Sequence, residues 1–588
     1  MISPRHIATQ ADLSPFYTRE YPQLFDYELA FTQRYRAVEN EPPAAREAAM
    51  VAFQFPHILV PMQPGDLLAG RIAYPKVAVG PQAVGVGYSC PIRELTRDVG
   101  NGKYTGQSAE KARALIEFWQ PRRTQTKVRE AFPAWLQELM PSDEWAWEAG
   151  ETFPLYRIAG LQFSYETLLE LGIGGLREQI AARSPQPDGA LAQGFHAALG
   201  VLVSSMRRYE QDIRARLTGQ TLSVADRNAF AQVADDLEHL QTKAPTSFRQ
   251  ACQLMWLYSL HAGVWNYGRL DEDLGPFLAE DLDRGVLTEE AATVLLQSLF
   301  KLMHAYDNRF DNRVMVGGKG RQYEEDADRF AVLAMEAVLR NRLNQPQLSL
   351  RFYEGQNPVL YEKALEVIGA GCTFPILYND ERAVADVMKA HGLDEQTALQ
   401  WLPYGCGETM ILNQSVATPN AIINLPEILN RTLAYAVKKP KQAKTFDAFF
   451  DLYARRVDAL MRAGAFVQKI QYDVVGQTLP FLFISLLYDD CLERGRGLLE
   501  GGVRYLSGTN ETYGNITCSD ALTAIKQRVY QKNKYTLAQL KKALDADFEN
   551  AQALREDLLR APKFGNDNEA ADAMARRVHE QVCLSASS

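Results

Sequence analysis

The segment QLSLRF at residues 347–352 and the segment FPILY at residues 374–378 decide the fold class of this chain. Both are short, largely apolar runs of the kind that form strands. The sequence after each has a helical pattern, and another strand-like segment follows some twenty or more residues later. This alternation favours parallel strands joined by helical crossovers, and it predicts an α/β protein.

Helices are predicted over most of residues 165–305. The segment 248–260 is apolar on most faces, which indicates a buried helix. The helix that opens near residue 165 is expected to end at the glycine cluster of residues 172–175, because glycine commonly terminates helices. Thr288 stands before an acidic first turn and is therefore a predicted N-cap.

Three further local signals lie outside this region. Residues 58–61 and 66–71 read as short strands broken by a Pro-Gly turn. Thr536 and Gln539 form a capping-box pattern, and the apolar residues that follow mark one helix face as far as Phe548.

Length and composition limit the function. At 588 residues the chain could hold two or three domains, or one large barrel with helical additions. A net charge of −9 argues against nucleic acid as the main partner. Charges of both signs alternate along the chain, and this pattern is interpreted as a solvated surface. No apolar run approaches the ~20 residues that span a bilayer, so we expect no membrane partner.

The cysteines indicate a reducing compartment. There are seven, none at C-x-x-C spacing, and an odd number spread over this length is not a disulfide framework. The N-terminal segment carries no apolar core of a secretory signal. We therefore expect a cytoplasmic protein.

The hexapeptide YGCGET at residues 404–409 carries the chemistry. On an extended segment, Cys406 and Glu408 would point to the same side, about 6–7 Å apart, which leaves room for one small substrate. Gly405 and Gly407 allow a tight loop that no side chain crowds. A one-electron sulfur reagent paired with a general base is the favoured interpretation, although most cysteines are simply small buried hydrophobes.

Other chemistries find little support in the sequence. The eight histidines include no H-E-x-x-H and no i, i+4 pair, so no metal site is expected. Phosphate-loop and serine-elbow motifs are also missing. The segment GRLD at residues 268–271 is interpreted as an exposed turn with an internal ion pair, although Asn266 and Tyr267 before it could line a cavity. Asn379 is read as a helix N-cap.

Several segments together resemble the glycyl radical enzyme family, which includes pyruvate formate-lyase and the diol, glycerol and choline lyases. The similarity follows family order along essentially the whole chain, and such an ordered set is far more specific than any single piece. The matching segments are residues 61–70, 165–176, 248–251, 268–271, 374–380, 405–408, 501–505, 520–526 and 561–567.

The resemblance implies the fold and the site. The family fold is a ten-stranded barrel of two five-stranded parallel half-sheets surrounded by helices, with a central cysteine finger loop. Residues 1–588 would form one such catalytic domain. Cys406 matches the thiyl residue, and Glu408 would be the base. The expected substrate-binding residues are Asn266, Tyr404, Thr409 and Asn420.

One departure from the family pattern sets the expected partners. The family's radical glycine lies in a C-terminal loop that reads approximately Arg-Val-Ser/Ala-Gly-Tyr, and this sequence contains no such motif. We expect a small second subunit to supply the glycyl radical, in a dimer of heterodimers. The resemblance implies a separate activase that uses S-adenosylmethionine and an iron–sulfur cluster, and no cofactor bound to this chain.

The substrate is left open. A loose alignment puts apolar Leu161, Gly263 and Val264 where the small-diol dehydratases carry polar pocket residues, and Asn420 where they carry an acid. Hydroxylated sugars or polyols, phosphorylated ring ethers, and amino or sulfonated alcohols all remain candidates. Two other functions stay open as well: a decayed barrel that acts as a binding or scaffold protein, and a non-radical lyase that uses Cys406 as a nucleophile.

Overall fold

The protein is described from a computed structural model, which divides the chain into two compact units. It describes residues 14–80, 86–141, 150–156, 158, 160–219, 221–306 and 312–587, without the side chains of residues 419 and 420. Unit 1 comprises residues 1–127, 157–417 and 473–507, and unit 2 comprises residues 128–156, 418–472 and 508–588. That all 588 residues serve as one catalytic domain stays a prediction.

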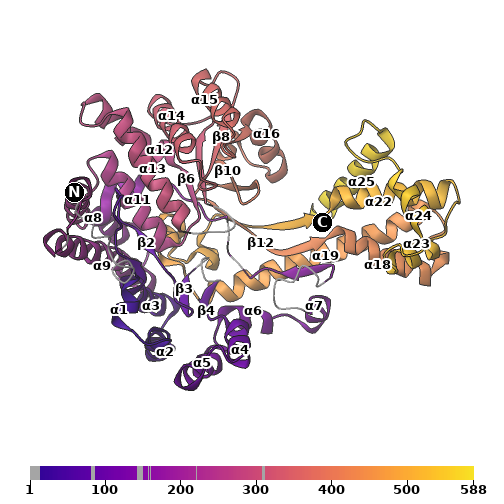
Figure 1. Cartoon of the computed structure of the whole chain (residues 1–588), viewed down its shortest axis with the longest axis horizontal. Helices are drawn as coiled ribbons and strands as arrows, with labels where there is room; N and C mark the ends of the chain where they lie inside the picture. The colour runs from indigo at the N-terminus through magenta and orange to yellow at the C-terminus, as the bar shows by residue number, and fades with distance from the viewer. Residues whose placement is uncertain are drawn as a thin grey trace, which may run out of the picture. The chain divides into compact units, whose positions relative to one another are not determined.

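Unit 1 is organised around a four-stranded parallel sheet (Figure 1). Its strands are β6 (Asn266–Arg269), β7 (Arg313–Gly317), β8 (Gln347–Phe352) and β9 (Ile376–Asn379), paired in chain order. Helices connect successive strands: α12 (Leu270–Asp283), α13 (Glu289–Ala305), α14 (Glu324–Asn341) and α15 (Pro358–Gly369). The predicted parallel strands with helical crossovers are therefore confirmed.

The two faces of this sheet differ in polarity because side chains alternate along each strand. Helices α12 and α14 pack against β7 and cover one face. The opposite face carries Arg313, Ser349 and Arg351, which are all buried. The residues of the intervening positions are Val314, Val316, Leu348 and Leu350, each fully buried. The sheet is therefore apolar toward its helices and polar on its other side.

A β-hairpin lies on the polar side of the sheet. It consists of β10 (Trp401–Tyr404) and β11 (Glu408–Ile411), which pair antiparallel. One apolar cluster joins it to the sheet, and that cluster comprises Met315, Leu402, Tyr404, Met410, Leu412 and Ala417, with Tyr378 packed against it. The hydrophobic effect thus holds the hairpin against a mostly polar sheet face.

The remaining strands form small antiparallel sheets. They are β1 (Leu59–Val60) with β2 (Arg71–Ile72), β3 (Ala78–Gly80) with β4 (Gly87–Ser89), and β13 (Tyr505–Tyr513) with β12 (Ser415–Asn424) and β5 (Thr152–Pro154). The strand predicted at residues 66–71 is wrong for all but Arg71, because the backbone N–H groups of Leu67 and Ala69 donate to side chains and not to a neighbouring strand. Among the described strands, none of these sheets closes into a ten-stranded barrel.

The helices of unit 1 confirm one prediction and correct another. Helix α11 (Phe248–Ala262) is buried at almost every position, as predicted, and ends at Gly263 in the left-handed conformation. Helix α8 (Glu166–Arg183) does not end at residues 172–175 as expected. It kinks at Gly172, with φ 61° and ψ −174°, and then continues. A Cβ there would lie 2.7 Å from the Ala244 backbone nitrogen, so the glycine serves a close approach.

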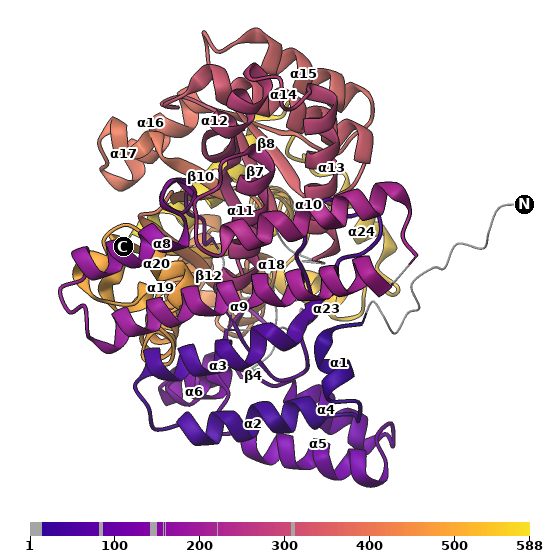
Figure 2. The same cartoon turned by 90° about the vertical axis from the view of Figure 1, so that its left-hand side faces the viewer.

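Other helices of unit 1 form a layer in which α9 packs along both α3 and α10 (Figure 2). Thr288 caps α13 as predicted, because its side chain accepts a hydrogen bond from the Ala291 N–H group. The bounds are α1 (Phe16–Glu20), α2 (Asp26–Val38), α3 (Pro43–Ile58), α4 (Ile92–Gly100), α5 (Gly106–Trp119), α9 (Ala190–Gly219), α10 (Val224–Leu240), α16 (Asp380–His391), α17 (Glu395–Leu399), α20 (Leu482–Leu487) and α21 (Cys491–Arg494).

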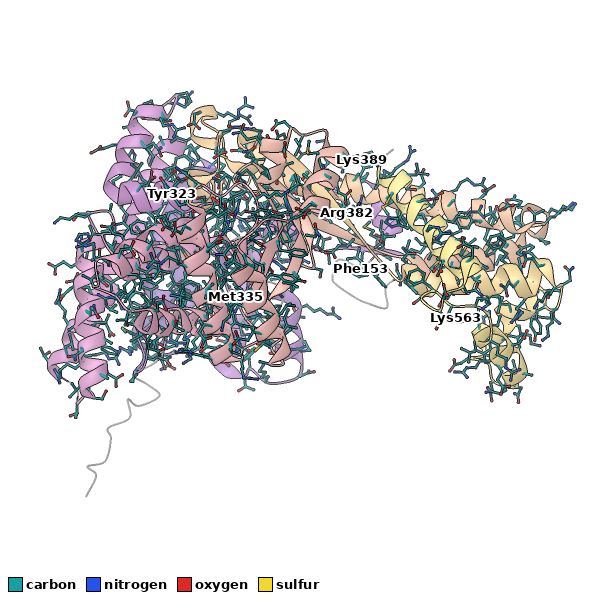
Figure 3. The ribbon with its side chains drawn as sticks, turned by 90° about the horizontal axis from the view of Figure 1, so that it is seen from above. Phe153, Tyr323, Met335, Arg382, Lys389 and Lys563 are labelled. Atoms are coloured by element: carbon teal, nitrogen blue, oxygen red, sulfur yellow. The ribbon has the colours of Figure 1, made fainter. Side chains whose placement is uncertain are left out.

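Side chains of helices α14 and α16 sort by polarity. Met335 of α14 is fully buried, whereas Arg382 and Lys389 of α16 are exposed (Figure 3). On α16 the buried positions are Val384 and Val387, so this helix has one apolar face. The N-cap predicted at Asn379 is confirmed, because its side chain accepts a hydrogen bond from the Arg382 N–H group.

Unit 2 is mainly helical. Its apolar core includes Phe449, Tyr453, Leu460, Cys518 and Leu522. The capping box at Thr536 is confirmed, although the helix ends before Phe548. The bounds are α7 (Ala134–Leu139), α18 (Leu425–Lys438), α22 (Asn515–Ile525), α23 (Leu537–Asp545), α24 (Gln552–Leu559) and α25 (Glu569–Ser587), and α6 (Thr124–Glu130) and α19 (Phe446–Gly476) cross the division between units. No helix in the described part of the chain is long and apolar enough to span a membrane.

Candidate active site

The hairpin β10–β11 presents Cys406 at its tip, where the side chain is exposed. Residues 405–407 form a turn closed by a 2.9 Å hydrogen bond from the Gly407 N–H group to the Tyr404 carbonyl. Gly405 and Gly407 have φ angles of 52° and 124°, which only glycine adopts readily. The tight loop predicted from these glycines is confirmed. The extended geometry assumed for the spacing of Cys406 and Glu408 is wrong, because the positive φ angles reverse the chain.

The carboxylate of Glu408 folds back over this turn. The Gly407 N–H group donates a 3.1 Å hydrogen bond to Glu408 Oε2. A Cβ atom built on Gly405 would lie only 2.5 Å from the same oxygen. The absence of a side chain at Gly405 therefore makes room for the carboxylate. Glu408 is half-buried, whereas the neighbouring Cys406 is exposed.

Arg313 of β7 fastens the turn to the sheet. Its guanidinium makes hydrogen bonds to the Gly405 carbonyl at 2.6 Å, the Ser349 hydroxyl at 2.6 Å, Gln347 Oε1 at 3.0 Å and the Tyr378 hydroxyl at 3.2 Å. Arg313 is almost fully buried. Sequence reasoning missed this set of residues. The only available signal was the alternation of polar with apolar residues along β8, which marks one polar face.

The predicted substrate-binding residues lie in different parts of the structure. Tyr404 is buried and pairs with Glu408 across the hairpin, while Thr409 is half-buried beside it. Asn266 is buried on β6, next to Arg313 of β7 in register. Asn420 belongs to β12, and its side chain lies outside the described part of the chain. Three of the four therefore lie in one region: Asn266 is on the polar face of the sheet, and Tyr404 and Thr409 are in the hairpin that packs on this face.

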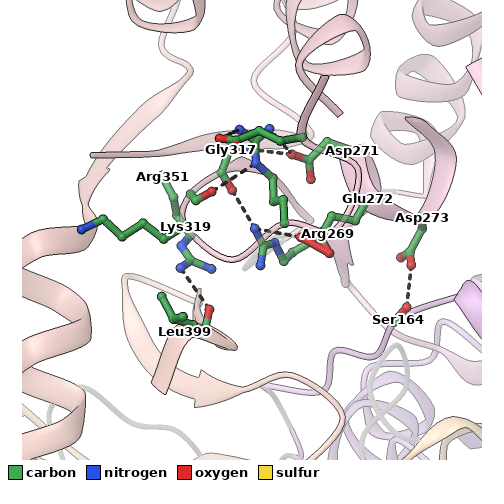
Figure 4. A network of polar contacts seen from close by, with 12 residues as sticks. Ser164, Arg269, Asp271, Glu272, Asp273, Gly317, Lys319, Arg351 and Leu399 are labelled. Carbon is green, nitrogen blue, oxygen red and sulfur yellow. Dashed lines mark hydrogen bonds and ion pairs between the residues drawn. The ribbon is translucent and has the colours of Figure 1, made fainter. Parts of the chain in front are cut away.

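A network of buried charges occupies the carboxyl ends of the parallel strands (Figure 4). The Arg269 guanidinium contacts the Gly317 carbonyl at 3.1 Å and Glu272 at 2.9 Å. Asp271 accepts from the Gly317 N–H group at 2.7 Å and pairs with Arg321. Arg269 and Asp271 are each at most 1% exposed. The interpretation of residues 268–271 as an exposed turn is therefore wrong. The interpretation of the alternating charges along the chain as a solvated surface does not hold for Arg269 and Asp271, because both are buried.

Arg351 extends this network toward the hairpin. It makes a two-pronged ion pair with Asp380, at 2.9 and 3.0 Å, and both side chains are fully buried. The same guanidinium donates to the carbonyls of Leu399 and Trp401, where β10 begins. Burial lowers the pKa of Arg351 to about 10, and the positive charge of Arg269 adds to this effect. Arg351 thus fixes the start of the hairpin as Arg313 fixes its tip.

A cavity of about 810 Å³ lies beside this network, at the end of the hairpin opposite Cys406. Arg269, Asp273 and Gln400 are among its lining residues. Burial raises the pKa of Asp273 to about 7, despite a hydrogen bond from the Ser164 hydroxyl. Within the described residues, no three His, Cys, Asp or Glu side chains gather closely enough to hold a metal ion.

Comparisons with known proteins agree with this architecture. A family model described as pyruvate formate lyase-like matches residues 9–586. The chain is 25% identical to trans-4-hydroxy-L-proline dehydratase of Clostridioides difficile, over 79% of its own length and 64% of the relative's length. It is 24% identical to isethionate sulfite-lyase of Desulfovibrio desulfuricans, over 94% of this chain and 73% of the relative.

Solved structures show the same fold. The glycerol-bound B12-independent glycerol dehydratase of Clostridium butyricum superposes with a TM-score of 0.81 at 19% identity, covering 95% of this chain and 75% of that one. The hydroxyproline dehydratase of Clostridioides difficile gives 0.81 at 20% identity, covering 96% and 76%. The chain belongs to the pyruvate formate lyase-like family, and its sequence match spans less than two thirds, 64%, of the length of the first relative named above.

Proposed function

We propose that this chain is the thiyl-radical-bearing subunit of a glycyl radical lyase or dehydratase that acts in the cytoplasm. The observation that carries the proposal is the hairpin tip. Cys406 is exposed there, and the Gly407 N–H group holds the carboxylate of Glu408, two residues after Cys406, by a hydrogen bond. The relatives named above are dehydratases and a sulfite-lyase, which supports elimination from a hydroxylated small molecule. The ten-stranded barrel of the family is part of this proposal, with the four-stranded parallel sheet as part of one half-sheet.

The radical source would lie on a small partner subunit, activated by an enzyme that uses S-adenosylmethionine and an iron–sulfur cluster. An exposed Cys406 suits this arrangement, because a second chain can reach the sulfur. The glycyl radical supplies the one-electron vacancy that the cysteine needs. We propose a dimer of heterodimers as the assembly, with no cofactor held by this chain itself.

Each residue of the hairpin tip has one role in the proposed cycle. Cys406 gives up its thiol hydrogen atom, and its sulfur then takes a hydrogen atom from the substrate carbon that bears a hydroxyl group. Glu408 accepts the hydroxyl proton, after which the neighbouring bond to the leaving group breaks. The product radical takes a hydrogen atom back from Cys406, which restores the sulfur radical. Asn266, Tyr404, Thr409 and Asn420 are the proposed substrate-binding residues, and Arg313 positions the turn.

The test is turnover by the assembly of this chain, a protein bearing the glycyl motif and an activase. Candidate substrates are isethionate, trans-4-hydroxy-L-proline and glycerol. Cys406→Ser should abolish product formation, and Glu408→Gln should lower the rate by at least ~100-fold. Cys583→Ser is the matched control, because Cys583 is also exposed but lies on α25. Full activity of Cys406→Ser would rule out the thiyl role of Cys406. Binding to partners without any turnover would favour the scaffold function instead.

A further inference from the structure

In the ranges that the structure describes, four buried arginines lie on or beside the parallel sheet, and three of them have a carboxylate partner. Arg269 pairs with Glu272 at 2.9 Å, and Arg351 pairs with Asp380 at 2.9 Å. Arg321 pairs with Asp328 at 2.8 Å, and also with Asp271 at 3.4 Å. These pairs follow the general rule that a buried charge is compensated by an opposite charge.

Arg313 departs from this rule. It is 1% exposed, yet in the described part of the chain its guanidinium donates to neutral oxygens of the backbone, Ser349, Gln347 and Tyr378 and lies 5.8 Å from the centre of the Tyr378 ring. No carboxylate in the described part of the chain forms an ion pair with it. Its Nε–H group has no hydrogen-bond partner either. Among the described residues, the positive charge of Arg313 is therefore buried without a counter-ion, which costs several kcal/mol in a protein interior unless a further group supplies one.

Asn266 has a matching deficiency next to Arg313. It is 1% exposed, and both its side-chain nitrogen and its side-chain oxygen lack a partner. Residues aligned on adjacent parallel strands point to the same face of the sheet, and Asn266 is aligned with Arg313. Two neighbouring side chains on one sheet face thus offer an amide donor, an amide acceptor and a charged N–H donor, and none of these three groups has a hydrogen-bond partner.

Glu408 does not compensate Arg313. Its carboxylate accepts a hydrogen bond from the Gly407 N–H group and makes no ion pair with the guanidinium. Arg313 instead donates to the carbonyl of Gly405, within the same turn. This separation leaves the carboxylate available as a proton acceptor, and it leaves the charge of Arg313 for another group.

We propose that the substrate carries an oxyanion group, either a carboxylate or a sulfonate. Arg313 Nε and the Asn266 amide nitrogen hold this group within reach of the turn at residues 405–407, which we call the cysteine turn. This inference rests on the proposed function, because it assigns the substrate class of the same site. The oxyanion is the missing counter-ion, and it accepts a hydrogen bond from each of the two N–H donors. The Asn266 side-chain oxygen then remains to accept a hydroxyl hydrogen of the same substrate. A neutral diol would leave the charge of Arg313 buried and uncompensated.

The binding of small anions and neutral diols to the full chain tests the proposed oxyanion site without any radical chemistry. Isethionate and lactate are the sulfonate and carboxylate probes, and ethylene glycol and 1,2-propanediol are neutral molecules of similar size. Calorimetry at matched ionic strength should show at least tenfold tighter binding of one or both anions than of either diol. Asn266→Leu should weaken anion binding at least tenfold. It should also raise the melting temperature, because it removes a buried amide without partners.

Two further variants complete the test. Arg313→Gln should also lose anion binding, but it removes the anchor of the cysteine turn, so Asn266→Leu is the decisive variant. Arg504→Gln is the control for loss of one positive charge, because Arg504 is 40% exposed and pairs with Asp490. Equal binding of diols and anions, no measurable anion binding, or unchanged anion binding by Asn266→Leu would overturn the inference.

The two proposals fail in different ways. If the anions bind as expected but the activated assembly turns nothing over, the substrate class stands as a binding property and the radical function falls. If the assembly turns over only neutral diols, the radical function stands and the oxyanion inference falls.

Discussion

At the scale of single residues, the buried ion pair between Arg351 and Asp380 has the clearest energetic consequence. Both side chains are fully buried, and the arginine also holds the carbonyls of Leu399 and Trp401. Removing one member of such a pair leaves an uncompensated charge in the interior, whereas exposed pairs contribute little. The stability of the hairpin that carries Cys406 should therefore depend strongly on this pair.

Asp380→Asn should destabilise the protein by about 3–5 kcal/mol, because the guanidinium of Arg351 stays buried without its carboxylate. Chemical denaturation measures the change in unfolding free energy. Glu280→Gln is the control, since Glu280 and Arg284 form an i, i+4 pair that is more than half exposed. That variant should change stability by less than about 0.5 kcal/mol. Similar effects of the two substitutions would show that Arg351 finds compensation elsewhere.

At the scale of elements, the turn between β10 and β11 sets the geometry of the site. Gly405 combines a positive φ with a close approach of the Glu408 carboxylate, at 2.5 Å from an added Cβ. Gly407 has an even less common φ, but an added Cβ would meet nothing closer than 3.6 Å. Only Gly405 is therefore required both for its backbone conformation and for the space that it leaves.

Gly405→Ala should displace the Glu408 carboxylate and lower turnover by at least ~10-fold, in addition to a backbone cost of about 1–2 kcal/mol. Gly102→Ala is a matched control, because Gly102 has a φ of 72° and open space around it. Both variants should lose similar stability in thermal unfolding, but only Gly405→Ala should lose activity. Retained activity in Gly405→Ala would mean that the position of Glu408 does not matter for the reaction.

Much of the element scale could be predicted from the sequence, and the exceptions have physical reasons. The alternation of strand and helix signals predicts β8, β9 and their crossovers, because local periodicity reports burial directly. The kink at Gly172 could not be predicted, since it serves a contact with Ala244, which is distant in the sequence. The glycines of residues 404–409 predict the cysteine turn, whereas no local pattern predicts the role of Arg313, because its partners come together only when three strands are paired.

At the scale of the whole molecule, buried carboxyl groups link stability to pH. Burial raises the pKa of Asp273 from 3.8 to about 7, and it raises the pKa of Glu47 to about 7 as well. Between about pH 4 and pH 7 the native protein keeps these protons while the unfolded chain has released them. Each group therefore stabilises the fold most at low pH, and this contribution is lost as the pH rises through about 7.

Asp273→Asn should remove one of these contributions. The stability of the wild type relative to the variant should fall between about pH 4 and pH 7, by an amount on the order of a few kcal/mol, and stay constant above that range. Glu47 is unchanged in both proteins, so its effect cancels in the difference. Thermal unfolding across this pH range provides the measurement. A difference that does not vary with pH would mean that Asp273 is ionised in the native state.

The most direct test of the central claim follows a hydrogen atom through Cys406. The substrate that the activated assembly turns over is deuterated at its hydroxyl-bearing carbon, and mass spectrometry locates the deuterium in the product. If the sulfur of Cys406 takes up and returns the hydrogen atom, deuterium should appear on the carbon that lost the leaving group, and Cys406→Ser should give no product. Deuterium retained on the hydroxyl-bearing carbon, or product formed by Cys406→Ser, would contradict the radical mechanism.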